Sequence, residues 1–254
     1  MISMLKVSMH QPNFLPYTGF FDKIRKSSLF IVVDHLTFSK GRDNWHHRNR
    51  IRTSSPDGWD YITVPVSEHW NWKPFHEARI SEVFSFRRRK HLRSIEMNYR
   101  RAPYFDRYFE EFSEIYSQDD RDLTEFNIRL IMWFLERFRI KAEVLRSTEL
   151  DFNNGFTKND MIIDLMKRVD GTHFISGNGA TEYIEPEKFE QAGISLELQN
   201  FSPEPYPQTY PGFVPNLSAI DALMNCGGLE PNGGPAAAEA STSAARKRIA
   251  VKAR

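Results

Sequence analysis

Polar and ionisable side chains follow two apolar runs near the start of the chain. His10, Gln11 and Asn13 come directly after the first run, and Asp34 ends the second. Ligands of an open α/β sheet bind beyond the carboxyl ends of its strands, so these side chains meet at one edge if the two strands are neighbours. A carboxylate at Asp34 would orient the imidazole of His10 and raise its pKa. We therefore predict His10 and Asp34 as catalytic residues, with a helix or turn cap as the alternative role of Asp34.

The loop after His10 is suited to hold a site in place. Pro12 and Pro16 fix backbone angles and lower the entropy cost of ordering the loop. Gly19 lies at the start of the next expected helix, whose free N–H groups could bind a phosphate or carboxylate. The alternative interpretation is a well-packed turn with a hydrogen-bonded histidine.

A basic and aromatic stretch at 38–52 is the most distinctive feature of the sequence. It reads FSKGRDNWHHRNRIR, with cationic side chains on both sides of Trp45. Arginine forks bind phosphate or carboxylate through two hydrogen bonds, and tryptophan can stack on a base or a sugar. The stretch predicts a small anionic substrate, for example a nucleotide sugar, and the alternative is a solvated charged face. The substrate-binding residues predicted around it are Gln11, Asn13, Lys40, Trp45, Arg48, Asn49 and Arg50.

A second loop with two glycines lies at 175–180 and reads ISGNGA. Glycines permit close approach of a ligand to the backbone, so Ser176 and Asn178 are further predicted substrate contacts. The alternative is an ordinary turn between a strand and a helix. Ser176 lacks the surrounding elbow motif that a serine nucleophile requires.

Composition limits the cofactors and partners. Cys226 is the one cysteine, which excludes an internal disulfide and a zinc site with several cysteines. The adjacent His46 and His47 would point to opposite faces of a strand, so we predict no metal site and no specific cofactor. The 34 basic and 33 acidic residues give a formal net charge of +1, which carries no specific nucleic-acid signal.

The sequence also predicts a cytoplasmic location. The first residues, MISMLKVSMHQPN, lack the apolar core and cleavage site of a signal peptide. No uncharged apolar run approaches the ~20 residues of a transmembrane helix. A single cysteine fits a reducing compartment.

The order of expected elements predicts an α/β fold with a mixed or parallel sheet flanked by helices. Two strands joined by a short helix in the first 34 residues indicate a Rossmann-like β-α-β start. We expect one domain over 1–226 and a flexible tail rich in Gly, Pro and Ala, basic at its end, over 227–254. Strands are expected at 4–9, 29–33, 59–66, 142–145, 173–175 and 194–198, and helices at 20–27, 84–116 with a break at Ala102-Pro103, 123–138, 161–169 and 217–224.

Together these segments resemble the WbqC-like family. The likeness is carried by HQPNFLPYTGFFDKI at 10–24, FIVVDHLTFSK at 30–40, RNRI at 48–51, WDYITVPV at 59–66, FISGNGATEYI at 174–184 and YPQTYPGFVPNLSAIDALMNCG at 206–227. It spans nearly all of 1–227 in order. The residues DNWHH before RNRI depart from the pattern.

The resemblance implies a role in bacterial O-antigen and other surface polysaccharides. By position in the pattern, it implies a site of His10, Gln11, Pro12, Asn13, Asp34, Lys40, Arg48, Asn49 and Arg50. The leading hypothesis is a transferase that modifies a nucleotide- or lipid-linked sugar. The alternatives are a nucleotidyltransferase-like enzyme, which the absence of an HxGH motif disfavours, and a non-catalytic sugar- or nucleotide-binding protein.

Overall fold

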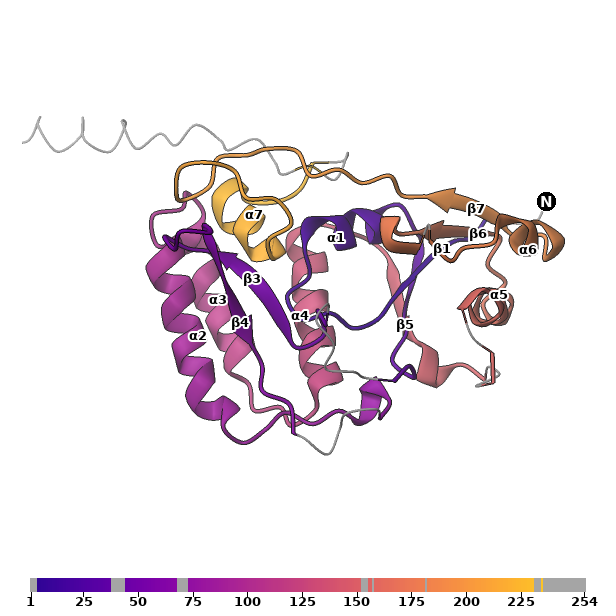
Figure 1. Ribbon diagram of the computed structural model, residues 1–254, viewed down its shortest axis with the longest axis horizontal. Coiled ribbons are helices and arrows are strands. Elements are labelled where there is room, and N and C mark those ends of the chain that lie inside the picture. Colours follow the sequence, from indigo (N-terminus) through magenta and orange to yellow (C-terminus); the bar gives the residue numbers. More distant parts are fainter. Residues whose placement is uncertain are drawn as a thin grey trace, which may run out of the picture.

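The computed structural model describes residues 4–37, 44–67, 73–151, 155–156, 158–180, 182–230 and 234 (Figure 1). Short 3₁₀ turns lie at Phe75–Glu77, Ser147–Glu149 and Asn178–Ala180. The strands are β1 (Lys6–His10), β2 (Leu29–Val32), β3 (Arg48–Arg52), β4 (Trp59–Thr63), β5 (Glu143–Arg146), β6 (His173–Ser176) and β7 (Ser195–Leu198). The helices are α1 (Thr18–Arg25), α2 (Phe84–Tyr99), α3 (Phe105–Ser117), α4 (Leu123–Arg137), α5 (Lys158–Arg168), α6 (Pro186–Gln191) and α7 (Ala219–Cys226).

Five strands form a parallel sheet in the order β5-β2-β1-β6-β7. The chain adds β2 and β5 on one side of β1, and β6 and β7 on the other. This is the order of a doubly wound sheet, and the direction of winding reverses between β1 and β6. The α/β class and the Rossmann-like start are confirmed, and the sheet is parallel rather than mixed. The reversal opens a crevice at the carboxyl ends of β1 and β6, where ligands of such sheets bind.

Both faces of the sheet are covered by helices, as the continuous apolar run of β2 requires. Leu29 and Ile31 join a cluster with α5 and α6, whereas Phe30 and Val32 join a larger cluster with α1 and α4. Neighbouring residues of a strand point to opposite faces, so one short strand supplies both cores. The carboxyl edge of the sheet remains between the two layers of helices (Figure 1).

A long insertion between β2 and β5 builds the second half of the molecule (Figure 1). It holds the antiparallel pair β3-β4 and the helices α2, α3 and α4. The predicted break at Ala102-Pro103 separates α2 from α3, because proline lacks the N–H that a continuous helix needs. The α4 helix begins where the Asp122 carboxylate accepts hydrogen bonds from the backbone N–H groups of Thr124 and Glu125. Its apolar stripe is buried, as predicted from helical spacing.

Some elements differ from the predictions. Residues 48–52 were predicted as part of a basic binding stretch and were not among the expected strands, but they form β3 and pair in register with β4. The short helix α6 was not predicted. The expected tail at 227–254 lies mostly outside the described residues, while Gly227 ends α7 with a φ of +80°, a conformation that favours glycine. Within the described part of the chain, no helix has the length and apolarity to span a bilayer.

Candidate functional site

Two adjoining cavities lie at the carboxyl ends of β1 and β6. The first has a volume of about 290 Å³ and the second about 450 Å³. Small-molecule sites typically measure about 300–1,000 Å³, so the first cavity lies just below this range and the second lies within it. His10 and Gly179 line both cavities. His10 ends β1 and Gly179 follows β6, so the junction lies at the crevice that the strand order creates.

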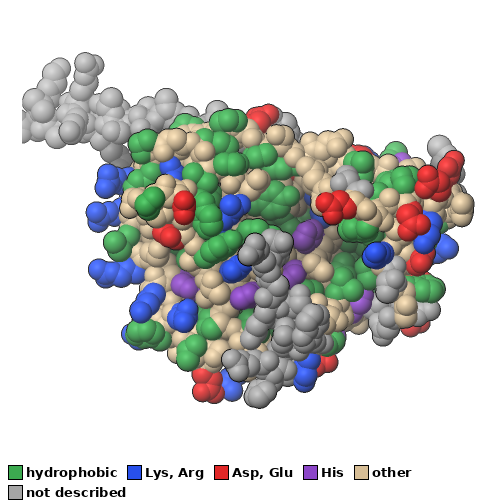
Figure 2. Space-filling model, viewed as in Figure 1, with side chains coloured by type: hydrophobic (Ala, Val, Ile, Leu, Met, Phe, Trp, Pro, Cys, Tyr) green, Lys and Arg blue, Asp and Glu red, His purple; other side chains and the backbone are tan. Residues whose placement is uncertain are grey.

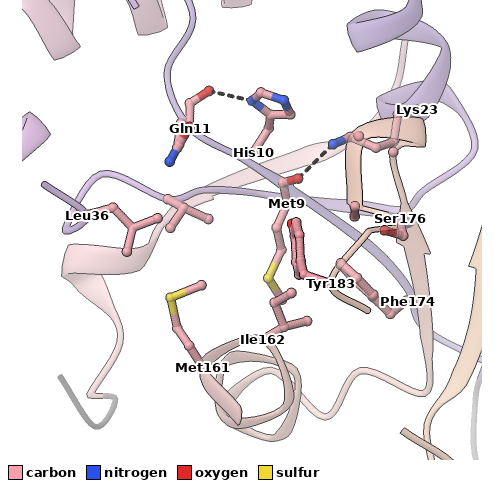
Figure 3. A pocket seen from close by; sticks show the side chains of 14 residues that line it. Met9, His10, Gln11, Lys23, Leu36, Met161, Ile162, Phe174, Ser176 and Tyr183 are labelled. Atoms are coloured by element: carbon pink, nitrogen blue, oxygen red, sulfur yellow. Dashed lines mark hydrogen bonds between the residues drawn. The ribbon is translucent and has the colours of Figure 1, made fainter. Parts of the chain in front are cut away.

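His10 has one ring nitrogen available at this junction. Its Nδ1 lies 3.0 Å from the backbone oxygen of Gln11 (Figure 3). Because a carbonyl oxygen only accepts, Nδ1 of the neutral ring carries the proton and donates it there. Nε2 is then unprotonated, and it has no hydrogen-bond partner among the residues that the structure describes. Burial, together with the nearby charge of Lys23, holds the pKa of His10 well below its usual 6.5. The ring is therefore neutral at pH 7 and can accept a proton at Nε2.

Lys23 of α1 is the cationic group of the first cavity (Figure 3). Its side chain is buried, and Nζ donates a hydrogen bond of 2.8 Å to the backbone oxygen of Met9. Burial lowers the pKa of Lys23 to about 7. The Ser176 hydroxyl, also buried in the lining of this cavity, has no hydrogen-bond partner in the described structure. The rest of the wall is mainly apolar, so this cavity combines one cation and one free hydroxyl with an apolar surface.

The second cavity is lined by aromatic and amide side chains around Arg50. The guanidinium carbon of Arg50 lies 5.5 Å from the ring centroid of Trp45 and 5.0 Å from that of Trp59. Its Nη2 donates to the backbone oxygen of Asn216 at 3.1 Å, while the buried Nε has no partner in the described residues. Cation–π contacts hold the guanidinium in place without neutralising its charge. The cavity therefore presents a positioned cation beside aromatic rings.

Two asparagines from the insertion hold the loop after β1. The side-chain amide of Asn49 donates to the backbone oxygens of Phe14 (3.1 Å) and Leu15 (2.7 Å). That of Asn127 donates to Pro12 at 2.8 Å. Leu15 has a φ of +42°, which is strained for a leucine and persists only where its surroundings enforce it. These hydrogen bonds keep the loop against the second cavity.

We expect the substitution Asn49→Ala to lower the free energy of unfolding by about 1–2 kcal/mol. The change removes both donors and leaves two buried carbonyl oxygens without them. Urea denaturation of the variant and the unmodified protein measures the difference. A change smaller than about 0.5 kcal/mol would show that the loop does not depend on this side chain.

Asp34 lies just beyond β2 and is fully buried. Its carboxylate accepts hydrogen bonds from Nε of Arg146 (2.8 Å), Oγ of Ser147 (2.9 Å), and both N (3.1 Å) and Oγ1 (3.0 Å) of Thr148. Burial alone would raise the pKa of Asp34, but these hydrogen bonds and the Arg146 charge hold the pKa below its usual value. None of the described hydrogen bonds joins Asp34 to His10, and the expectation that Asp34 raises the pKa of His10 is wrong. The contacts of Asp34 match the turn-cap alternative.

Comparison with known proteins gives the family. Residues 11–232 match the model of the WbqC-like protein family. The chain belongs to this family. It is also 30% identical to the uncharacterized protein Rv1507c of Mycobacterium tuberculosis over 234 residues, which are 90% of this chain and 97% of that protein. No solved structure matches the chain.

Most predicted substrate-binding residues of this WbqC-like protein line one of the two cavities. Arg48 lines neither, because its guanidinium lies over the ring of Tyr61, 4.5 Å from the centroid. Lys40 lies outside the described residues. Gln11 and Ser176 line the first cavity, and Asn13, Trp45, Asn49, Arg50 and Asn178 line the second.

Several residues that line the two cavities were not predicted from the sequence. Lys23 had a usable signal, because it lies three residues after Phe20 on the buried stripe of α1. Phe201 and Asn216 line the second cavity from irregular chain near the end of the fold, where neither periodicity nor a motif marks them. Within the described ranges, His, Cys, Asp and Glu side chains form no group of three that could hold a metal ion.

Proposed function

We propose that this WbqC-like protein is a transferase that modifies a nucleotide- or lipid-linked sugar for a bacterial surface polysaccharide. The observation that carries the proposal is the position of His10, whose unprotonated Nε2 lies where two cavities meet. A transferase needs such a junction, because the acceptor and the donated group must come together beside a base.

The second cavity fits the anionic part of the sugar-linked substrate. Arg50 offers positive charge to a phosphate, and Trp45 offers an aromatic ring on which a sugar or base can stack. Both kinds of carrier, nucleotide and lipid, attach the sugar through phosphate. The sheet order supports a nucleotide, since doubly wound sheets of this order bind nucleotides at the point where the winding reverses.

His10 would act as the general base in the transfer. A hydroxyl or amine of the acceptor gives its proton to Nε2 as its oxygen or nitrogen bonds to the transferred group. The donor's leaving group departs with the electron pair of the broken bond, and the imidazolium of His10 returns the proton to it or to solvent. Burial disfavours the charged imidazolium, so that the ring readily passes the proton on.

We expect the protein to bind UDP-, dTDP- or GDP-linked sugars, and Arg50→Met to weaken that binding at least ~10-fold through loss of a charged hydrogen-bond donor. Isothermal titration calorimetry measures the affinity. Arg93→Met is the matched control, because Arg93 is exposed on α2. Figure 2 shows Lys and Arg side chains along the edge of the molecule over α2, away from the central histidines.

The outcomes separate the alternatives. Binding that Arg50→Met weakens and Arg93→Met does not supports the substrate class. Binding without turnover in the presence of acceptor sugars would favour a non-catalytic sugar- or nucleotide-binding protein. If none of the three classes of nucleotide sugar gives a heat of binding, the nucleotide-linked form of the proposal is contradicted. Titration with polyprenyl-phosphate sugars in detergent would then test the lipid-linked form.

A further inference from the structure

The first cavity contains a buried lysine, Lys23, that has no counter-ion among the described residues. Lys23 is 4% exposed, and of the three protons on Nζ one is used in the hydrogen bond to Met9. Lys23 forms no ion pair with any residue that the structure describes. A buried ammonium without a partner is unfavourable, because its desolvation is not compensated. An anion that enters the cavity would supply the missing charge.

A free hydroxyl and two glycines lie on the same side of the cavity. Ser176 is 1% exposed, and its Oγ has no partner in the described structure. A methyl group placed on Gly177 would lie 3.5 Å from Nζ of Lys23, and one on Gly179 would meet nothing within 4 Å. Gly177 therefore brings the backbone close to Lys23, and the backbone at Gly179 is open to the cavity. The Ser176 hydroxyl and the open backbone can therefore contact the oxygen atoms of a ligand.

Most of the remaining wall is apolar, although Gln11 and Tyr183 also line it, and the apolar part determines which ligand end it fits. Met161 and Ile162 of α5 line the cavity together with Met9 and Phe174 (Figure 3). Apolar walls favour a hydrocarbon chain over a second polar group. One lysine neutralises one negative charge, so a carboxylate fits better than a phosphate dianion, which would leave charge buried without compensation.

We propose that the first cavity binds a small monocarboxylate with a short apolar chain, its carboxylate held between the Lys23 ammonium and the Ser176 hydroxyl. The chain would lie against Met161 and Ile162. This subsite goes beyond the proposed function, since it would exist equally in a protein that only binds its ligands. In a transferase it would hold an acyl-sized group beside His10, which lines the same cavity.

Butyrate, its uncharged analogue butyramide, and inorganic phosphate are the probes that test this subsite. Each is titrated into the full chain labelled with ¹⁵N, and the affinity and location come from backbone amide shifts. We expect butyrate to bind and to shift the amides of Gly177 and Gly179. Butyramide and phosphate should bind at least ~10-fold more weakly than butyrate. Butyramide lacks the negative charge of the carboxylate, and the phosphate dianion carries one negative charge more than Lys23 can neutralise.

Two variants and a matched control complete the experiment. Lys23→Met keeps the length and apolar character of the side chain, and it should weaken butyrate at least ~10-fold. Ser176→Ala should weaken butyrate binding ~3-fold or more. If Lys23→Met does not fold, the Ser176→Ala variant tests the subsite. Lys167→Met is the control, because Lys167 is an exposed residue of α5, the helix that also carries Met161.

Three results would contradict the proposed carboxylate subsite. They are no binding of butyrate, equal binding of butyramide or phosphate, and butyrate binding that neither Lys23→Met nor Ser176→Ala weakens. The titration contains no nucleotide sugar, so a failure here is distinct from a failure of the transferase proposal.

Discussion

His10→Ala is expected to lower kcat for sugar transfer by ~10²–10⁴-fold, the usual contribution of a general base. The variant loses the unprotonated Nε2 at the junction but keeps Arg50, Trp45 and the rest of the second cavity. Because proton transfer occurs only in the transition state, affinity for the nucleotide sugar should change far less than kcat. Steady-state kinetics with the nucleotide sugar that binds in the calorimetric titration, together with its Kd, separate the two effects.

His173→Ala is the control for this experiment. His173 begins β6 and pairs with Lys6 at the amino edge of the sheet, opposite the cavities. Its replacement should leave kcat within about twofold of the unmodified protein. Full activity in His10→Ala would rule out the proposed role of His10.

The pH dependence expected for the proposed transfer by the unmodified protein follows from the lowered pKa of His10. A protonated imidazole cannot act as a base, so activity falls as the pH drops through that pKa. Burial, and after it the positive charge of Lys23, lowers the pKa of His10 well below 6.5. The acid limb of kcat/KM should therefore lie below pH 6.5. A limb at or above pH 6.5 would contradict the burial of a neutral imidazole at this position.

The second large effect is expected at Asp34, on stability rather than on chemistry. Asp34→Ala should lower the free energy of unfolding by about 3 kcal/mol, because Arg146, Ser147 and Thr148 lose the acceptor for their hydrogen bonds. Urea denaturation at pH 7 measures the change. Glu96→Ala on the exposed face of α2 is the control and should change stability by less than about 0.5 kcal/mol.

The sign of the pH effect at Asp34 is determined by its lowered pKa. In the folded protein the pKa lies below the value of about 3.9 in the unfolded chain. The stabilisation is therefore fully present above pH 3.9 and is lost as the pH falls through the folded pKa. The difference between the unmodified protein and Asp34→Asn should narrow below pH 4. A difference that stays constant from pH 7 to pH 3 would mean that folding does not lower the pKa of Asp34.

Much of the sheet and its edge could be predicted because the signals are local. The run at 29–33 is apolar without alternation, which indicates a strand buried on both faces, and β2 does supply both cores. The break at Ala102-Pro103 follows from the chemistry of proline alone. A polar residue that directly follows a predicted strand must lie at the carboxyl edge, so the position of His10 at that edge could be predicted.

Residues whose roles depend on distant contacts could not be predicted in the same way. The bond between Asp34 and Arg146 joins positions 112 residues apart, so nothing near Asp34 indicated that its carboxylate is already occupied. Arg48 and Arg50 look equivalent in the sequence. In β3, however, Arg48 lies over Tyr61 outside the cavities, while Arg50 lines the second one.

The amino-acid sequence by itself determined the family, the α/β class and the position of His10 at the end of the first strand, because each depends on residues that are close together along the chain. Only the tertiary structure decided that His10 joins two cavities, that Lys23 supplies the charge of one of them, and that Asp34 caps a turn. These properties arise from desolvation and from hydrogen bonds between segments far apart in the sequence, which exist only once the chain has folded.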